Sequence, residues 1–201
     1  MSGLGAVILA GGRATRLGGV SKPDLMVGGQ RLLTTAISAA RAAGCERIVV
    51  VGPPELRADG CLHVQEDPPF GGPVAGLAAG LGALGDRPEH VLVLACDMPE
   101  AGAAVARLTA ARAADPDADG VCLVDASGRT QWLAAIYSRA ALDAALDAAA
   151  RPEGDRAALH GAAMRRLAAS LDLVTVADGG STHDIDTWGD LARATGPEGT
   201  P

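Results

Sequence analysis

The stretch VILAGGRATRLGGVSK, residues 7–22, joins an apolar run of strand length to a loop rich in glycine and cations. Glycines let backbone N–H groups approach an anion closely, and Arg13, Arg16 and Lys22 add positive charge to the same loop. Both properties suit a phosphate group bound just beyond a strand. The spacing matches neither the Walker loop nor the dinucleotide fingerprint. A plain turn with solvated cations is the alternative interpretation.

Along the rest of the chain, apolar runs of strand length alternate with longer alanine- and leucine-rich runs. This alternation is typical of βαβ units and predicts an α/β fold, a three-layer sandwich with a Rossmann-like, mainly parallel sheet. Residues 91–95, VLVLA, are apolar at every position, as in a central strand covered on both faces. We expect strands at 6–10, 47–51, 62–65, 90–95, 120–124, 132–137 and 173–176, and helices at 31–43, 74–84, 102–113, 139–149, 155–169 and 188–194.

The length of 201 residues fits one domain of ordinary size. We expect a single domain over residues 1–195 and a disordered tail, GPEGTP, over 196–201. No apolar run reaches the roughly 18 residues that a membrane span needs. The first apolar stretch lacks a preceding cationic region and ends in glycines and an arginine rather than in a signal-cleavage pattern. The sequence therefore predicts a cytoplasmic protein.

Charge and cysteine content exclude further classes. The net charge of −7 argues against a nucleic-acid surface, because phosphate backbones bind clustered lysine and arginine. The four cysteines show no CxxC spacing, and each sits in or beside an apolar stretch, which is typical of buried free thiols rather than of disulfides or a zinc site. These cysteines are Cys45, Cys61, Cys96 and Cys122.

Ligands of parallel sheets bind beyond the carboxyl ends of the strands, so the segment EDPPFGGPVAGLAAGL, residues 66–81, is of interest. A proline suits the first helical position, and the small residues around it leave a flat gap for a planar base, with Asp67 at its mouth. An ordinary helix start is the alternative interpretation. The small-residue turn consists of Gly72, Pro73, Ala75 and Gly76.

A carboxylate follows the most apolar strand, in the segment ACDMP, residues 95–99. Burial there is costly for Asp97 unless a cation or a hydrogen-bond donor accompanies it. A Mg²⁺ ion that carries a nucleoside triphosphate would be such a partner. The alternative is that Asp97 caps the next helix.

Two further carboxylates occur in HDIDTWGDL, residues 183–191. Asp184 and Asp186 lie on one face if the backbone is extended, because side chains alternate along extended chain. Two such charges raise each other's pKa unless a metal or another cation lies between them. Alternatively, Asp186 caps the helix expected to begin near Trp188.

In combination these motifs resemble the MobA-like nucleotidyltransferase family, and within it the molybdenum cofactor guanylyltransferases. The family's opening LAGG stretch with its following Arg, Gly and Lys matches residues 9–22. Its GPLAG turn with a preceding Asp matches residues 67–76, its PCDxP pattern matches 95–99, and its late NxNTPEDL pattern matches 184–191. The resemblance spans nearly the whole chain.

The resemblance implies a fold of the nucleotide-diphospho-sugar transferase type and a Mg²⁺-dependent transfer of GMP from GTP to molybdopterin, with release of pyrophosphate. It implies that Arg16, Lys22 and Asp97 are catalytic. Asp97 and Asp186 would bind the metal, and Asp184 and Asp186 would contact the acceptor. The nucleotide-binding residues that it implies are Leu9, Ala10, Gly11, Gly12, Arg13, Lys22, Asp67, Gly72, Pro73, Ala75, Gly76 and Asp97.

Asp184 and Asp186 stand where the guanylyltransferases have asparagines, and Trp188-Gly189 replaces the family's Pro-Glu. Aspartates there resemble other branches of the superfamily, which leaves open cytidylyl transfer to molybdopterin or transfer to a sugar phosphate or lactate phosphate. A catalytically inactive nucleotide-binding accessory protein is a further alternative. Guanine is favoured by the LAGG form of residues 9–12 and by the GPVAG form of residues 72–76.

The partners that follow from the resemblance are GTP and a phosphorylated small-molecule acceptor, with molybdopterin expected. Proteins that deliver the cofactor or receive it would make transient contact. Nucleic acid and membrane are not expected as partners.

Overall fold

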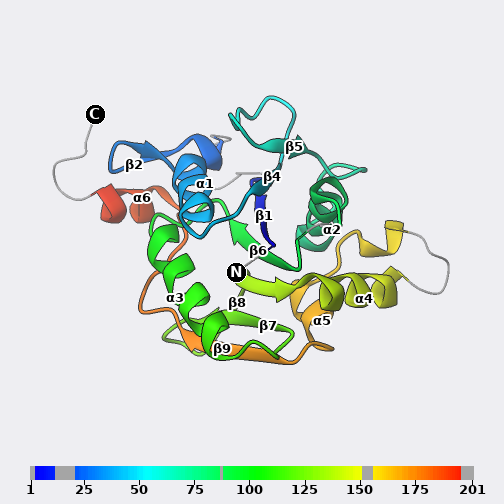
Figure 1. Cartoon of the computed structure of the whole chain (residues 1–201). Coiled ribbons are helices and arrows are strands. Elements are labelled where there is room, and N and C mark those ends of the chain that lie inside the picture. Colours follow the sequence, from blue (N-terminus) through cyan, green and yellow to red (C-terminus); the bar gives the residue numbers. More distant parts are fainter. Residues whose placement is uncertain (1–2, 12–20, 87, 151–155, 196–201) are drawn as a thin grey trace.

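A seven-stranded sheet forms the centre of the computed structural model, which describes residues 3–11, 21–86, 88–150 and 156–195 (Figure 1). The strand order is β5-β4-β1-β6-β8-β7-β9, and all neighbours pair in parallel except β8, which is antiparallel to β6 and β7. The expected mainly parallel sheet is confirmed. Its strands are β1 (Leu4–Leu9), β4 (Arg47–Val51), β5 (Leu62–Val64), β6 (His90–Ala95), β7 (Gly120–Val124), β8 (Thr130–Ser138) and β9 (Leu173–Ala177).

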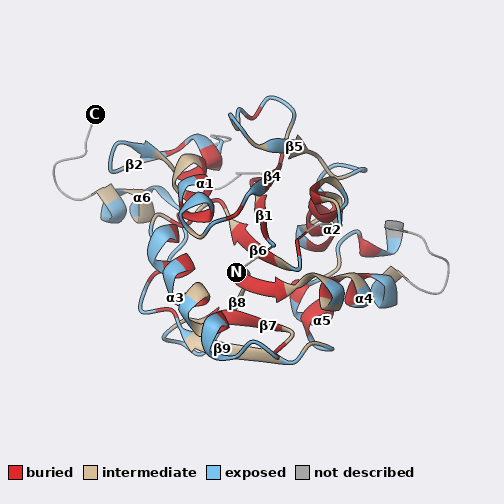
Figure 2. Ribbon diagram, viewed as in Figure 1, coloured by how far each residue is buried: buried red, intermediate tan, exposed pale blue. Residues whose placement is uncertain are grey.

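Helices cover both faces of the sheet, which confirms the three-layer architecture. On one face, α1 (Leu32–Ala42) and α3 (Ala101–Ala114) bury their apolar sides against the strands. On the other face, α2 (Pro73–Leu84), α4 (Arg139–Ala150) and α5 (Met164–Ala168) do the same. Figure 2 shows the resulting pattern, with buried central strands and helices exposed on their outer sides.

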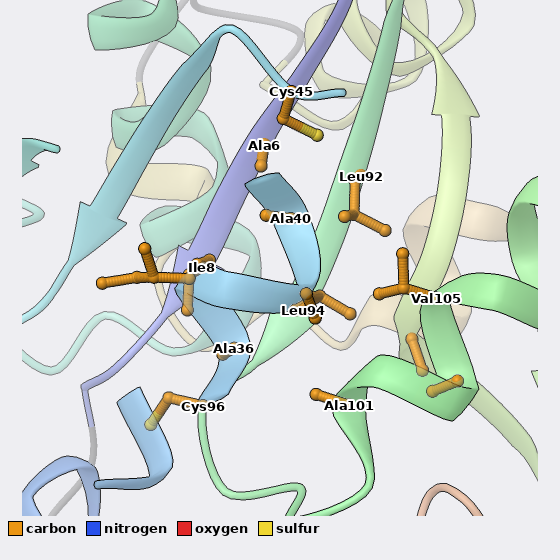
Figure 3. Close-up of a cluster of buried hydrophobic side chains, with 14 of the residues drawn as sticks. Ala6, Ile8, Ala36, Ala40, Cys45, Leu92, Leu94, Cys96, Ala101 and Val105 are labelled. Atoms are coloured by element: carbon orange, nitrogen blue, oxygen red, sulfur yellow. The ribbon is translucent and has the colours of Figure 1, made fainter. Parts of the chain in front are cut away.

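The core between α1, α3 and the sheet is built from small and branched side chains. Ile8 of β1 and Leu94 of β6 are fully buried, and each such side chain contributes roughly 1.5–3 kcal/mol relative to an exposed position. Alanines such as Ala36 and Ala101 let the two helices approach the strands closely (Figure 3). The two central strands, β1 and β6, are therefore held firmly on this face of the sheet.

The helix expected over 155–169 is wrong as a single element. The structure has a 3₁₀ helix, η3 (Arg156–Leu159), and then α5 from Met164, while residue 155 lies outside the described residues. Gly161 separates the two with a φ of +73°, in the left-handed region that a continuous helix cannot contain. Its backbone N–H donates a 2.8 Å hydrogen bond to the Gly71 carbonyl, so a tertiary contact outweighs the local helix propensity.

Residues 22–31 form elements that the sequence pattern did not predict. A 3₁₀ helix, η2 (Lys22–Asp24), leads into a hairpin of β2 (Met26–Val27) and β3 (Gln30–Arg31), whose turn has Gly28 and Gly29 at φ of +57° and +78°. The hairpin contacts the last helix, α6 (Trp188–Thr195), which lies beside it in Figure 1. The segment before α6 is thereby brought next to η2.

Three further predictions concern membrane spans, the cysteines and the C-terminal tail. Within the described part of the chain, no helix combines the length and the apolar character needed to cross a bilayer. All four cysteines are free thiols, and all but the partly exposed Cys61 are buried. The tail predicted for residues 196–201 lies outside the described residues.

Candidate active site

The carboxyl ends of β1, β4 and β6 lie side by side at one edge of the sheet. Backbone pairing continues one residue past each strand: the Ala10 N–H donates to the Val51 carbonyl at 2.7 Å, and the Cys96 N–H donates to the Leu9 carbonyl at 3.1 Å. The edge predicted to carry the ligand site is therefore an ordered platform, with Asp97 as the next residue after Cys96.

Three carboxylates and one ammonium group meet on this platform. Asp97, Asp184 and Asp186 each place a carboxylate oxygen within 4.8 Å of the other two, and we call these residues the carboxylate cluster. Lys22 Nζ donates to Asp97 Oδ2 at 3.3 Å and also to Asp186 Oδ1. The fold thus joins three motifs that are distant in sequence.

A buried isoleucine positions the two C-terminal carboxylates. Ile185 is 2% exposed and packs with Leu25 and Leu32 in a small apolar cluster of its own. Its backbone N–H donates a 3.1 Å hydrogen bond to the carbonyl oxygen of Asp97. Because Ile185 points into the protein, its neighbours Asp184 and Asp186 reach the cluster together, as the alternation of side chains predicted.

The same apolar cluster positions Lys22. Leu25 follows it by three residues, and the Leu25 N–H donates to the Lys22 carbonyl at 3.1 Å, which closes the turn of η2. Pro23 is buried between them. The ammonium group and the C-terminal carboxylates are therefore anchored by one shared packing unit.

Helix capping, the alternative role for the aspartates, falls to other residues. The Asp190 N–H donates to Thr187 Oγ1 at 3.2 Å, while Asp190 Oδ2 accepts from the Thr187 N–H at 2.7 Å. This reciprocal pair is a capping box at the start of α6, so Asp186 is not the cap. Likewise α3 has Glu100, not Asp97, at its N-cap position.

The electrostatics of the site favour a bound cation. Burial raises the pKa of Asp97, and the charge of Asp184 raises it further, while the Lys22 ammonium acts in the opposite direction. Partial burial by itself lowers the pKa of Lys22, but the hydrogen bond to Asp186 and the charge of Asp97 outweigh burial and raise it. Lys22 is therefore an ammonium ion at neutral pH, bonded to two of the three carboxyl groups of the cluster.

The carboxylate cluster has the chemistry of a site for a hard divalent cation. Mg²⁺ and Mn²⁺ prefer oxygen ligands, and three carboxylates on converging segments supply them. The residues present therefore fit such a metal, with Asp184 added to the expected ligands Asp97 and Asp186.

The residues expected to hold the base are divided between the end of β1 and the small-residue turn at the start of α2. Leu9 is partly buried, Ala10 is buried, and Gly11 is exposed. A Cβ placed on Gly76 would lie 3.3 Å from Leu9 Cδ2, so the small-residue turn and the end of β1 pack against each other. The helix begins at Pro73, as its position in the sequence predicted.

Other expected site residues are placed differently or not at all. Asp67 is exposed on the loop between β5 and α2 and does not belong to the carboxylate cluster. Gly72 and Ala75 are partly buried at the start of α2. The predicted phosphate-binding residues Gly12, Arg13 and Arg16 lie outside the described residues.

Sequence reasoning missed two side chains beside the small-residue turn. A Cβ on Gly71 would lie 2.8 Å from His160 Cδ2, which places this histidine against the turn. Phe70 is 54% exposed and has a φ of +64°, a conformation that side chains other than glycine seldom adopt. The sequence offered a signal for Phe70, because it is the one aromatic residue in segment 66–72. It offered none for His160, because the histidines are scattered along the chain.

Comparison with known proteins supports a nucleotidyltransferase. The family model described as "MobA-like NTP transferase domain" matches residues 6–172, which include Asp97 but end before Asp184 and Asp186. Curated relatives named "Molybdenum cofactor guanylyltransferase" come from Bradyrhizobium sp. (38% identity, 65% of this chain and 64% of the relative) and Acidiphilium cryptum (37%, 71% and 71%). A third, from Pseudomonas fluorescens, is 40% identical over 46% of this chain and 47% of its own length, so the chain spans about half of that relative.

Solved structures agree on the fold. The Rv0371c protein from Mycobacterium tuberculosis H37Rv superposes with a TM-score of 0.72 at 24% identity, over 96% of this chain and 97% of that one. Molybdopterin-guanine dinucleotide biosynthesis protein A from Archaeoglobus fulgidus gives 0.65 at 22% identity, over 94% and 96%. A manganese complex of Rv0371c gives 0.67 at 20% identity, over 96% and 98%. With a family model that matches most of its length, the chain belongs to the MobA-like NTP transferase family.

Proposed function

We propose that this protein transfers GMP from GTP to the terminal phosphate of molybdopterin and releases pyrophosphate. The observation that carries the proposal is the meeting of Lys22 with the carboxylate cluster at the carboxyl ends of β1 and β6. The curated relatives named as guanylyltransferases support the choice of base and acceptor.

In this reaction an oxygen of the acceptor phosphate attacks the α-phosphorus of GTP, and the bond from that phosphorus to the bridging oxygen of the β-phosphate breaks. Electrons move onto the leaving pyrophosphate, so the protein must position the groups and neutralise charge rather than supply a nucleophile. Lys22 and, by family resemblance, Arg16 would hold the triphosphate and balance that charge.

Asp97 and Asp186, with Asp184 beside them, would hold Mg²⁺. When bound, the metal stabilises negative charge on the phosphate oxygens. Asp184 and Asp186 would also contact the acceptor, because Ile185 holds both aspartates at the carboxyl edge of the sheet.

The base would lie against the end of β1 and the small-residue turn. Leu9 and Gly76 pack together there, and Gly72 opens the turn with a φ of +87° that suits glycine. Guanine offers an N1–H and an amino group, for which the exposed Asp67 and nearby backbone carbonyls would be acceptors. A site that pairs these donors discriminates strongly against a base that lacks them.

The test is pyrophosphate release with Mg²⁺ and molybdopterin, comparing GTP with CTP. We expect GTP to be used at least about a hundredfold better, because unpaired polar groups in a matched site cost far more than a lost apolar contact. Equal use of CTP would overturn the guanylyl assignment.

A second acceptor class is kept because of one feature, the two aspartates at positions where the guanylyltransferases have asparagines. Replacing molybdopterin in the same assay by a sugar phosphate or a phosphorylated lactate tests it. If pyrophosphate is released faster with one of these acceptors than with molybdopterin, the acceptor is reassigned and the protein is still a nucleotidyltransferase.

We further propose that the reaction takes place in the cytoplasm, with transient contact to proteins that deliver molybdopterin or receive the product. The free thiols of the four cysteines are consistent with that compartment.

A further inference from the structure

Lys22 contacts the same carboxylates that would hold the metal. Its Nζ lies 3.3 Å from Asp97 Oδ2 and donates a second hydrogen bond to Asp186 Oδ1. Both partners are assigned to the metal in the proposed function, on which this inference rests. An ammonium ion and a divalent cation would thus bind the same two side chains, Asp97 and Asp186.

Geometry places Lys22 inside the cluster rather than beside it. The three carboxylate oxygens lie within 4.8 Å of one another, and Lys22 bonds to residues from both segments that contribute them. Its side chain is 24% exposed, close to the 20% of Asp97, so water screens this contact only partly. A divalent cation at the same oxygens would be repelled by the ammonium charge at short range.

The backbone of Lys22 is held by contacts that do not involve its ammonium group. Lys22 is anchored through its carbonyl oxygen, which accepts from the Leu25 N–H, and through the buried Pro23 that follows it. The four-carbon stem and single point charge of a lysine suit such an exchange better than the rigid planar guanidinium of an arginine would.

We propose that Lys22 and the divalent cation compete for the carboxylate cluster, so that Lys22 holds the cluster together until a metal-bound nucleotide displaces its ammonium group onto the triphosphate. Lys22 is then a positioning residue in the nucleotide-free enzyme as well as a phosphate ligand in the complex. The protein alone should bind a divalent cation weakly, and metal and nucleotide should bind together.

The test measures Mn²⁺ binding to the intact protein in the absence of nucleotide, from the electron paramagnetic resonance signal of free Mn²⁺. Lys22→Met removes the charge and keeps most of the side-chain volume, and we expect it to bind Mn²⁺ at least about tenfold more tightly than the wild type, because a like charge leaves the site. Lys22→Gln gives the same comparison if the methionine variant folds poorly. Lys22→Arg keeps the charge and is expected to stay near the wild-type affinity.

Unchanged or weaker Mn²⁺ binding by both neutral variants would overturn the competition, and so would a gain of the same size in Lys22→Arg. Asp97→Asn separates this failure from failure of the proposed function. If that variant loses Mn²⁺ binding while the neutral lysine variants gain none, the metal site stands and only the competition is wrong. If Asp97→Asn binds Mn²⁺ as the wild type does, the metal assignment and this inference both fall.

A readout of stability gives an independent check. Adding Mn²⁺ should raise the melting temperature of Lys22→Met more than that of the wild type. A ligand that binds only the native state stabilises it more strongly as the ratio of ligand concentration to dissociation constant increases. A larger rise in the wild type would contradict the proposal.

Discussion

The backbone N–H of Ile185 donates a 3.1 Å hydrogen bond to the carbonyl oxygen of Asp97. This bond ties the segment before α6 to the loop after β6, and the buried Ile185 side chain secures the same junction against Leu25 and Leu32. Two of the three carboxylates of the cluster thus depend on one residue that has no polar side chain of its own.

Ile185→Ala should therefore damage both stability and activity. Removing a buried isoleucine typically costs about 2–5 kcal/mol, and we expect the lower end because this apolar cluster is small and peripheral. Turnover should fall as well, since Asp184 and Asp186 lose their anchor. Urea unfolding and pyrophosphate release measure the two effects. Ile185→Val is the matched control, with a loss of about 0.5–1.5 kcal/mol; wild-type turnover in the alanine variant would contradict the positioning role.

Asp97→Asn should abolish transfer without unfolding the protein. A neutral amide is a poor ligand for a hard cation, and loss of one electrostatic stabiliser typically costs about 10²-fold or more in rate. The fold should survive, because burial already raises the pKa of this carboxyl and so disfavours its charged form. Turnover within about threefold of the wild type, far less than the usual loss of about 10²-fold, would remove Asp97 from the metal site.

Lys22→Ala should lower turnover by about 10²-fold, by analogy with the loss of one preorganised donor to a developing negative charge. Arg16→Ala should weaken GTP binding in addition. Steady-state kinetics with GTP and acceptor separate the two effects. If both variants keep their affinity and turnover, the loop of residues 11–22 is a plain turn and does not bind phosphate.

Two glycines of α2 should respond to alanine in opposite directions. A Cβ on Gly80 would lie 2.5 Å from Val7 Cγ1 in the core, so Gly80→Ala should destabilise the fold by about 1–3 kcal/mol through overpacking. Gly82 is exposed, and no described atom lies within 4 Å of its Cβ position. Gly82→Ala should stabilise by roughly 0.5–1 kcal/mol through helix propensity. Thermal unfolding of both variants checks the difference in sign.

The capping box of α6 predicts a pH dependence. Hydrogen bonds from the Thr187 hydroxyl and backbone N–H lower the pKa of Asp190 below its ordinary value of 3.8. The stability it contributes is therefore present above about pH 4 and is lost as the pH falls through the lowered pKa. The difference in melting temperature between the wild type and Asp190→Asn should shrink on acidification. Asp147→Asn, at an exposed position of α4, is the control. If the difference in melting temperature between the wild type and Asp190→Asn grows toward low pH, the prediction is wrong.

Local order along the chain was predictable to a large extent. The apolar runs that became β1, β4 and β6 are short, rich in β-branched residues or leucine, and bounded by glycine, proline or charge, so their strand character follows from neighbouring residues alone. The topological rule that ligands bind at the carboxyl ends of parallel strands then placed Leu9 and Asp97 at one edge. Pro73 marked the start of α2 in the same way.

Several features of the structure depend on contacts between distant segments and could not be predicted from neighbouring residues. The helix expected over 155–169 is broken because Gly161 pairs with Gly71, and η2 and its hairpin form because Leu25 packs with Leu32 and Ile185. Asp184 and Asp186 are recognisable as a pair in sequence, but only the tertiary structure puts Lys22 between Asp186 and Asp97. Packing and long-range electrostatics act through space and leave no periodic signal in the chain, whereas strand and turn preferences act over a few bonds and do.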